Sequence, residues 1–291
     1  MTLVLPAYIT ETTTLHTGIV LLIASLALYV VRSLSPKNWI HHTGWGLLLL
    51  AIVALASSIA IRSQTATYFA LSNMYESLMM LAMLLFTAFL VLDRRFNLRY
   101  AGWAVVILGL GTVAFATTLP MEIKPLQAAL QSYWRSIHVP IIIGSYAMFS
   151  LAFVSSLAYL VTNAFRSPAT PLASGGSGTG SFNTAPDSLS LYDEVTYRCV
   201  ALGFPLLAIG IILGGLWANE AWGNYWSWDP KESMSLVTLL AYGAYLHLRV
   251  NDNKSPKILA WVSVIGFAIM LLTYFGVNIM GVGLHSYGKI G

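Results

Sequence analysis

The chain has few charged side chains. Asp, Glu, Lys and Arg make up 9% of its 291 residues, whereas hydrophobic residues make up 57%, and the mean hydropathy is +0.72. Soluble globular domains carry about 25% charged residues. This shortage excludes a soluble enzyme or binding module and indicates an integral membrane protein. The net charge of +4 comes from uneven loops rather than from a basic patch, so we expect no nucleic-acid partner.

Cysteine is almost absent, since Cys199 is the only one in the sequence. A single cysteine cannot form an internal disulfide or a C-x-x-C redox pair, and it cannot supply the C-x-x-C-H attachment motif of a c-type haem. If the protein handles thiols or haem, the acceptor motif belongs to another protein.

The hydrophobic residues gather in long runs. Each run is close to the length of about 20 residues that a membrane-spanning helix needs. The first run lacks a basic leading region and a small-residue cleavage pattern, so it predicts a span rather than a signal peptide. The eight runs are residues 17–33, 43–62, 73–92, 101–119, 139–163, 199–217, 230–249 and 258–281. The sequence therefore predicts an all-α integral membrane protein with about eight transmembrane helices.

The basic residues predict the orientation of these spans. With the N-terminus outside, ten of the 15 Lys and Arg residues lie in inner loops and five lie on the outer side. Positive charge favours the inner side, so we expect an N-out/C-out protein. Residues 125–137 carry hydrophobic side chains at helical spacing, which predicts a short amphipathic helix in the outer interface. Pro140 suits the first turn of the span that follows.

One segment differs in composition from the rest of the chain. Residues 167–190 are rich in Ser, Gly, Pro, Ala and Thr, which is typical of a flexible linker. We expect it on the inner side, between helices 1–5 in residues 1–166 and helices 6–8 in residues 191–291.

Four tryptophans lie between Trp217 and Asp229, in a predicted outer loop over residues 217–232. Tryptophans beside spans commonly form an aromatic belt, but indole rings also pack against flat ligands. The loop ends in Asp-Pro-Lys-Glu, which predicts a capping box with Asp229 as N-cap and Glu232 at the third helical position. The alternative role for this ending is contact with haem propionates through Lys231. A second capping box is predicted at Asn73 and Glu76.

Three histidines are candidate ligands. His138 and His285 both fall on the predicted outer face, where two neutral imidazoles can ligate one haem iron while the tryptophans pack against the porphyrin. His247 follows Asp229 by 18 residues on one helix, which places it about 27 Å away, near the inner face. If it ligates haem, it belongs to a second site whose other ligand comes from elsewhere. The alternative is that these histidines are solvated at the interface.

The motifs together resemble a known family. Trp222-Gly223-x-x-Trp226-x-Trp228-Asp229-Pro230-Lys231-Glu232, followed by Tyr245-Leu-His247-Leu-Arg249, resembles the "WWD" signature of haem-handling proteins, in the CcsA branch of system II cytochrome c maturation. Residues 71–78, 132–139, 145–146 and 283–288 agree with this branch, and the resemblance covers about residues 68–291. One departure is Ser233-Met234, where the family often has a tryptophan.

The resemblance implies a concrete function. CcsA-type proteins work with a membrane partner, CcsB (also called Ccs1), to move haem b to the outer side and promote its thioether attachment to C-x-x-C-H apocytochromes. It implies a subunit of a holocytochrome c synthase, or haem lyase, complex that also depends on thiol-reducing proteins of the pathway. His138 and His285 match the axial ligands of the outer haem, and His247 matches the membrane histidine. The haem-holding loop corresponds to Trp222, Gly223, Trp226, Trp228 and Asp229.

Two other functions are compatible with the residues. One is a haem carrier or exporter without a synthase role, and the other is a bis-histidine electron-transfer cytochrome b. We assign no catalytic acid or base. A thylakoid membrane is favoured by the resemblance, and a bacterial cytoplasmic membrane is the alternative.

Overall fold

The computed structural model describes residues 4–35, 37–98, 101–165, 188–251 and 254–276. These residues form α-helices and contain no strand, which confirms the all-α class. A three-residue 3-10 turn, η1, and a π-helical turn, η2, complete the described elements. The elements are α1 (Val4–Leu34), α2 (Asn38–Ala66), α3 (Met74–Phe96), α4 (Gly102–Ala116), η1 (Ala128–Leu130), α5 (Tyr133–Ala164), α6 (Ser188–Trp222), α7 (Pro230–Val250), α8 (Pro256–Leu271) and η2 (Leu272–Gly276).

Six helices are long and apolar enough to cross a membrane: α1, α2, α3, α5, α6 and α8 continued through η2. The expectation of eight spans is thus supported for six of them by length and composition. Helix α4 has 15 residues, or about 22 Å, which is shorter than a hydrocarbon core of about 30 Å. Helix α7 has 21 residues, but Glu232 in its first turn and His247 and Arg249 in its last turn reduce its apolar character.

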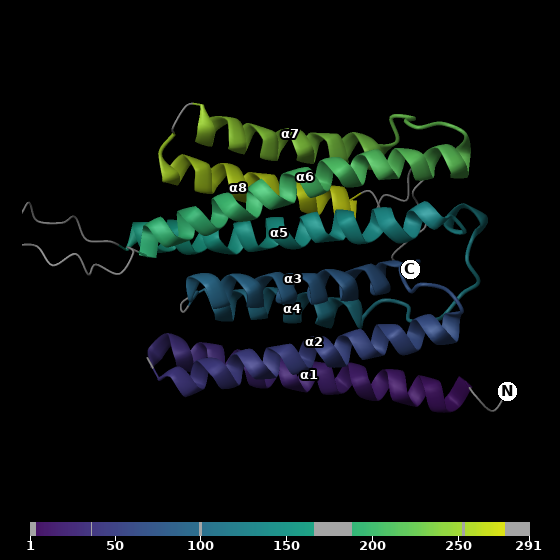
Figure 1. Cartoon of the computed structure of the whole chain (residues 1–291), viewed down its shortest axis with the longest axis horizontal. Helices are drawn as coiled ribbons and strands as arrows, with labels where there is room; N and C mark the ends of the chain where they lie inside the picture. Colours follow the sequence, from purple (N-terminus) through teal and green to yellow (C-terminus); the bar gives the residue numbers. More distant parts are fainter. Residues whose placement is uncertain (1–3, 36, 99–100, 166–187, 252–253, 277–291) are drawn as a thin grey trace, which may run out of the picture.

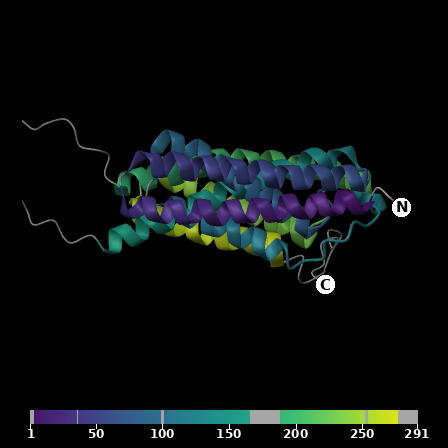
Figure 2. The ribbon, with the colours of Figure 1, turned by 90° about the horizontal axis from the view of Figure 1, so that it is seen from below.

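The helices form two groups that lie along a common axis, with α1–α4 in one and α5–α8 in the other (Figure 1). Helices α3 and α5 pack at the boundary between the groups. One end of the bundle contains the first residues of four helices, α1, α3, α5 and α7. The last residues of α2, α6 and η2 lie at the same end (Figures 1 and 2). The loop between α6 and α7, residues 223–229, lies at this end. We call this loop the Trp loop and this end of the bundle the Trp-loop end.

Helices α5 and α6 approach closely because glycine occupies their contact. A Cβ atom on Gly203 would lie 2.6 Å from Cε1 of Phe149, and one on Gly210 would lie 2.5 Å from Cδ1 of Ile142. Small residues allow such close packing of membrane helices. The contact between α5 and α6 fixes the position of the part of α5 that lines the cavity described below.

The predicted amphipathic helix over residues 125–137 is wrong. Between residue 125 and Ser132 only η1 is helical. Ser132 then caps α5 by accepting a hydrogen bond from the Trp134 N–H at 3.2 Å. The Arg135 guanidinium also donates to the Leu130 carbonyl at 2.8 Å, so a bend is fixed where one helix was expected. Because α5 begins at Tyr133, Pro140 lies inside the helix rather than in its first turn.

Buried ion pairs join the first three helices. Near the Trp-loop end, Arg62 of α2 contacts Glu11 of α1 at 3.2 Å and Glu76 of α3 at 2.7 Å. Near the opposite end, Arg32 of α1 contacts Asp93 of α3 at 3.3 Å. All five side chains are buried, so these pairs fix how the N-terminal hairpin packs on α3.

Candidate functional site

A cavity of about 180 Å³, partly open to solvent, lies at the Trp-loop end. It collects side chains from the start of α3, from η1, α5 and α6, from the Trp loop, and from α7 and η2. The lining residues are Leu71, Ser72, Asn73, Met74, Ser77, Leu130, His138, Val139, Ile142, Ile143, Tyr146, Ile211, Gly214, Gly215, Trp217, Tyr225, Trp226, Lys231, Glu232, Ser235 and Tyr274.

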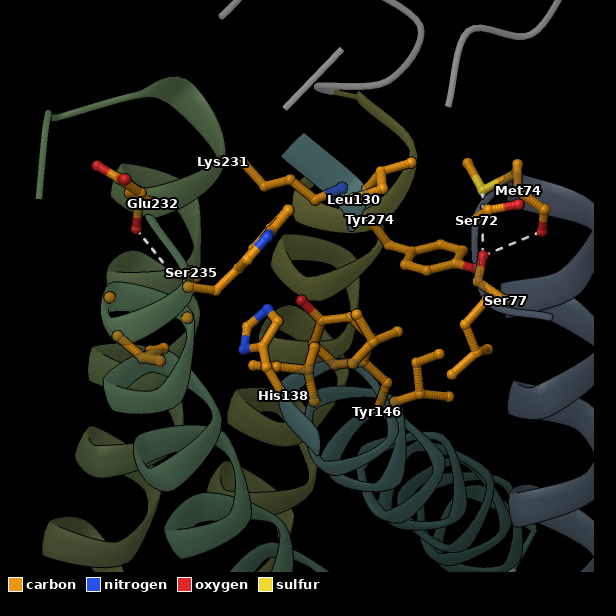
Figure 3. Close-up of a pocket in the computed structure, with 18 of the residues that line it drawn as sticks. Ser72, Met74, Ser77, Leu130, His138, Tyr146, Lys231, Glu232, Ser235 and Tyr274 are labelled. Carbon is orange, nitrogen blue, oxygen red and sulfur yellow. Dashed lines mark hydrogen bonds between the residues drawn. The ribbon is translucent and has the colours of Figure 1, made fainter. Parts of the chain in front are cut away.

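His138 of α5 points into the middle of this cavity (Figure 3). Its Nδ1 lies 2.7 Å from the Gly210 carbonyl oxygen. A carbonyl only accepts, so Nδ1 donates and the lone pair of the neutral ring is on Nε2. Histidines that ligate metals commonly donate their other ring N–H to a backbone carbonyl in this way. The ring also stacks on Trp217, with centroids 5.9 Å apart and planes 29° apart.

A glycine makes room for this imidazole. A Cβ atom on Gly214 would lie 2.7 Å from Cε1 of His138 and 3.0 Å from its Nδ1. No side chain fits there without moving the ring, so the position of His138 depends on the absence of a side chain on the facing turn of α6.

The Trp loop is fixed at both ends. Helix α6 ends at Trp222, and Gly223 follows with φ +78°, a conformation that favours glycine. At the other end the predicted capping box is confirmed: Asp229 accepts from the Lys231 N–H at 2.9 Å, and Glu232 accepts from the Asp229 N–H at 3.2 Å. The loop therefore presents its side chains from a defined backbone.

The opposite wall is the start of α3. The predicted cap there is confirmed in part: Asn73 accepts from the Glu76 N–H at 2.9 Å, but the Glu76 carboxylate accepts from the Ser72 N–H at 2.6 Å instead of reaching back to Asn73. The Ser77 and Tyr274 hydroxyls lie 2.7 Å apart across the cavity wall, linking α3 to η2 (Figure 3).

The structure brings together only part of the predicted site. His138 and Trp226 both line the cavity. Trp222 packs on Trp217 at 5.2 Å, and Trp228 packs edge-on against Trp226 at 5.7 Å while remaining 71% exposed. Gly223 and Asp229 shape the loop and do not line the cavity.

His247, the predicted ligand of a second site, does not share this cavity. His247 lies in the last turn of α7, at the opposite end of the helix, and is exposed. Its Nδ1 is 2.8 Å from Nδ2 of Asn251. A shallow apolar surface that includes Phe204, Leu240 and Gly243 surrounds it. His285 lies outside the described residues.

Several lining residues were not assigned a role from the sequence. Trp217 and Tyr225 belong to the tryptophan-rich segment, but nothing in the pattern separated lining rings from supporting rings. Tyr146 lies in a stretch that carried the family resemblance, and Tyr274 had no sequence signal. Their roles follow from the packing of α5 and η2 against α3.

This arrangement suits a flat, apolar ligand with a metal at its centre. Aromatic and aliphatic side chains form the walls, and His138 provides one imidazole nitrogen to the interior. Within the described ranges no three His, Cys, Asp or Glu side chains gather as a metal site. A macrocycle that already holds its metal needs only axial ligands from the protein.

The fold is that of a multi-pass helical membrane protein. The family model "Cytochrome C assembly protein" matches residues 71–285, and the chain belongs to this family. Within it, the chain is 34% identical to the cytochrome c biogenesis protein CcsA of Synechocystis sp., over 94% of this chain and 96% of that protein. It is 40% identical to CcsA of Synechococcus elongatus, over 82% and 85%, and 36% identical to CcsA of Guillardia theta, over 94% of each chain. These relatives place the protein in the CcsA family, and they fit a thylakoid or bacterial membrane.

A solved structure shares the fold. The chain resembles the protein titled "Cytochrome c Heme Lyase CcmF" with a TM-score of 0.67 and 15% identity, over 92% of this chain. The matched region spans about half of the CcmF chain, since it covers 46% of it.

Proposed function

We propose that this protein acts in c-type cytochrome biogenesis by binding haem b in the Trp-loop cavity and presenting it for thioether attachment to a C-x-x-C-H apocytochrome. The observation that carries the proposal is the His138 imidazole, held by the Gly210 carbonyl and Trp217 inside an aromatic cavity. Membership of the cytochrome c assembly family supports the same process.

Haem is the substrate here. Nε2 of His138 supplies one axial ligand, and His285 supplies the other. Trp226 and Tyr225 hold the porphyrin plane. Trp228 supports Trp226, and Trp222 supports Trp217, on which His138 stacks. Two thiols of the acceptor add across the two vinyl groups, and the acceptor histidine then replaces one axial ligand. Catalysis in this scheme is mainly the positioning of two reactants.

A second haem position involves His247. This residue and the capping residue Asp229 lie at opposite ends of α7, about 27 Å apart at 1.5 Å per residue. The exposed imidazole beside an apolar surface supports a transient site to which a CcsB-type (Ccs1) subunit supplies the second ligand. Haem then passes to the Trp-loop cavity. All eight helices cross the membrane in this proposal, with both termini and the Trp loop outside.

The axial role of His138 predicts a change in haem absorption. We expect His138→Ala, purified with its membrane partner, to lose the bis-histidine spectrum of the outer haem, because one ligand is gone. Added imidazole is expected to restore it by filling the space. His16→Ala, which removes an exposed histidine of α1, is the control. A His138→Ala protein with an unchanged spectrum and full cytochrome maturation contradicts the assignment.

The carrier alternative uses the same cavity but leaves the thioether step to another protein. We expect the purified complex, loaded with reduced haem, to form a covalent adduct with a C-x-x-C-H peptide, and His138→Ala to form much less. Haem that stays noncovalent while reaching an added synthase favours the carrier. Reversible reduction of the haem by quinol, without any adduct, favours the electron-transfer cytochrome.

A further inference from the structure

The cavity has one cationic side chain among its described lining residues. Lys231 reaches from the first turn of α7 along the cavity toward Leu130 (Figure 3). The carboxylate of Glu232 points away from the interior (Figure 3) and accepts hydrogen bonds from the Ser227 and Asp229 N–H groups at 2.8 and 3.2 Å. Glu232 therefore binds backbone N–H groups of the Trp loop, whereas the side chain of Lys231 extends into the cavity.

Axial ligation alone leaves the porphyrin one degree of freedom. An imidazole bound to the iron fixes the centre and the tilt of the ring, but the ring can still rotate about the iron–nitrogen axis. The two propionates of haem b lie on one edge of the macrocycle and the two vinyl groups on the opposite side. Which edge meets the acceptor thiols therefore depends on a contact at the periphery.

We infer that Lys231 binds a propionate of the haem and thereby sets the rotation of the porphyrin in its plane. This inference rests on the proposed function. A half-buried ammonium group in a mostly apolar cavity attracts a carboxylate strongly, because little water competes for either charge. The Asp229 carboxylate also attracts this ammonium group, but one oxygen of Asp229 is held by the Lys231 N–H as the helix cap.

The arrangement also assigns the vinyl groups to a side of the cavity. Met74, Ser77 and Tyr274 form an uncharged wall on the side of the cavity toward which Lys231 extends (Figure 3). With a propionate on Lys231, the vinyl-bearing edge lies on the side of the porphyrin away from Lys231, so the acceptor segment approaches there. Lys231 is a specificity-determining residue for haem in this scheme.

Porphyrin binding to the full-length protein tests this inference. The probes are iron protoporphyrin IX and its dimethyl ester, which has the same ring without carboxylate charges. We expect the protein to bind the free acid more tightly than the ester, and Lys231→Met to lose roughly 10- to 100-fold in affinity for the free acid, as for a hydrogen bond between charged groups. Its affinity for the ester stays unchanged, and Lys231→Arg keeps the preference.

Two measurements distinguish recognition of the propionate by Lys231 from a general disturbance of the Trp loop. The matched control is Lys124→Met, which removes a lysine whose side chain is 72% exposed in the preceding outer loop, and we expect it to bind both porphyrins normally. Among complexes with equal haem occupancy, Lys231→Met is expected to form less thioether with a C-x-x-C-H peptide, because its haem samples several rotations.

Three results overturn the inference. In the first, Lys231→Met binds the free acid as tightly as the unaltered protein does; in the second, it loses affinity for both porphyrins equally. In either case Lys231 does not recognise a carboxylate, and the proposed function stands. A protein that binds neither porphyrin before any substitution overturns the proposed function as well.

Discussion

Replacing Arg62 by methionine is expected to destabilise the folded protein by about 3–5 kcal/mol, the cost of removing one partner from a buried ion pair. Arg62 is 1% exposed and contacts two carboxylates, Glu76 at 2.7 Å and Glu11 at 3.2 Å. Without the guanidinium group, two buried carboxylates lose the cation that contacts both of them. Their repulsion and desolvation both favour the unfolded state.

The same substitution is expected to weaken the haem site. The Glu76 carboxylate that pairs with Arg62 also accepts from the N–H and the hydroxyl of Ser72, at 2.6 and 2.9 Å. Ser72 is part of the cavity wall. The ion pair therefore connects α2 to the wall of the site through two hydrogen bonds.

Unfolding of purified variants in detergent measures the loss of folding stability. Arg62→Met combined with Glu76→Gln is expected to recover part of the loss, because the amide oxygen can still accept from Ser72 while one uncompensated charge is gone. Arg198→Met is the control: its pair with Glu194 is 51% and 40% exposed, and such pairs contribute about 0.2–1 kcal/mol. If Arg62→Met and Arg198→Met lower the free energy of unfolding by equal amounts, the prediction is contradicted.

Replacing Gly214 by leucine is expected to abolish haem binding in the Trp-loop cavity. The first carbon alone would lie 2.7 Å from the His138 ring, and the remaining three carbons enter the space assigned to the porphyrin. The ring must leave its place against Trp217 and the Gly210 carbonyl. Both the axial ligand and the volume are lost, so added imidazole does not restore the haem spectrum.

A glycine without neighbours provides the control for this substitution. A Cβ atom on Gly111, on the exposed face of α4, meets no atom within 4 Å. We expect Gly111→Leu to bind haem normally, with absorption spectra and haem content per protein as the measurements. A Gly214→Leu protein that retains full haem content shows that the ligand lies elsewhere. Rescue of this variant by imidazole indicates that only the His138 ligand was lost.

Features set by nearby residues were predictable from the sequence. The capping box at Asp229 depends on a side chain and a backbone separated by two or three residues, and the structure has it as predicted. The helical class follows from the composition, since backbone groups in a membrane must find partners within their own segment. The interfacial helix was predicted wrongly because hydrophobic spacing in residues 125–137 does not reveal the Ser132 cap or the Arg135 bond that starts α5 there.

The shape of the site depended on contacts between distant segments. His138 and Gly210 are 72 residues apart, and Ser77 and Tyr274 are 197 apart. No local pattern indicates that Trp226 lines the cavity while Trp228 is exposed, because both belong to the same alternating motif.

The sequence by itself determined that this is a helical membrane protein with a fixed, tryptophan-rich loop and two histidines placed at opposite ends of the bundle, since hydropathy and capping act over short separations. Only the tertiary structure decided which aromatic rings form the cavity, which nitrogen of His138 bears the lone pair, and that Lys231 turns toward the cavity. These properties depend on how closely α5 and α6 pack through Gly203, Gly210 and Gly214.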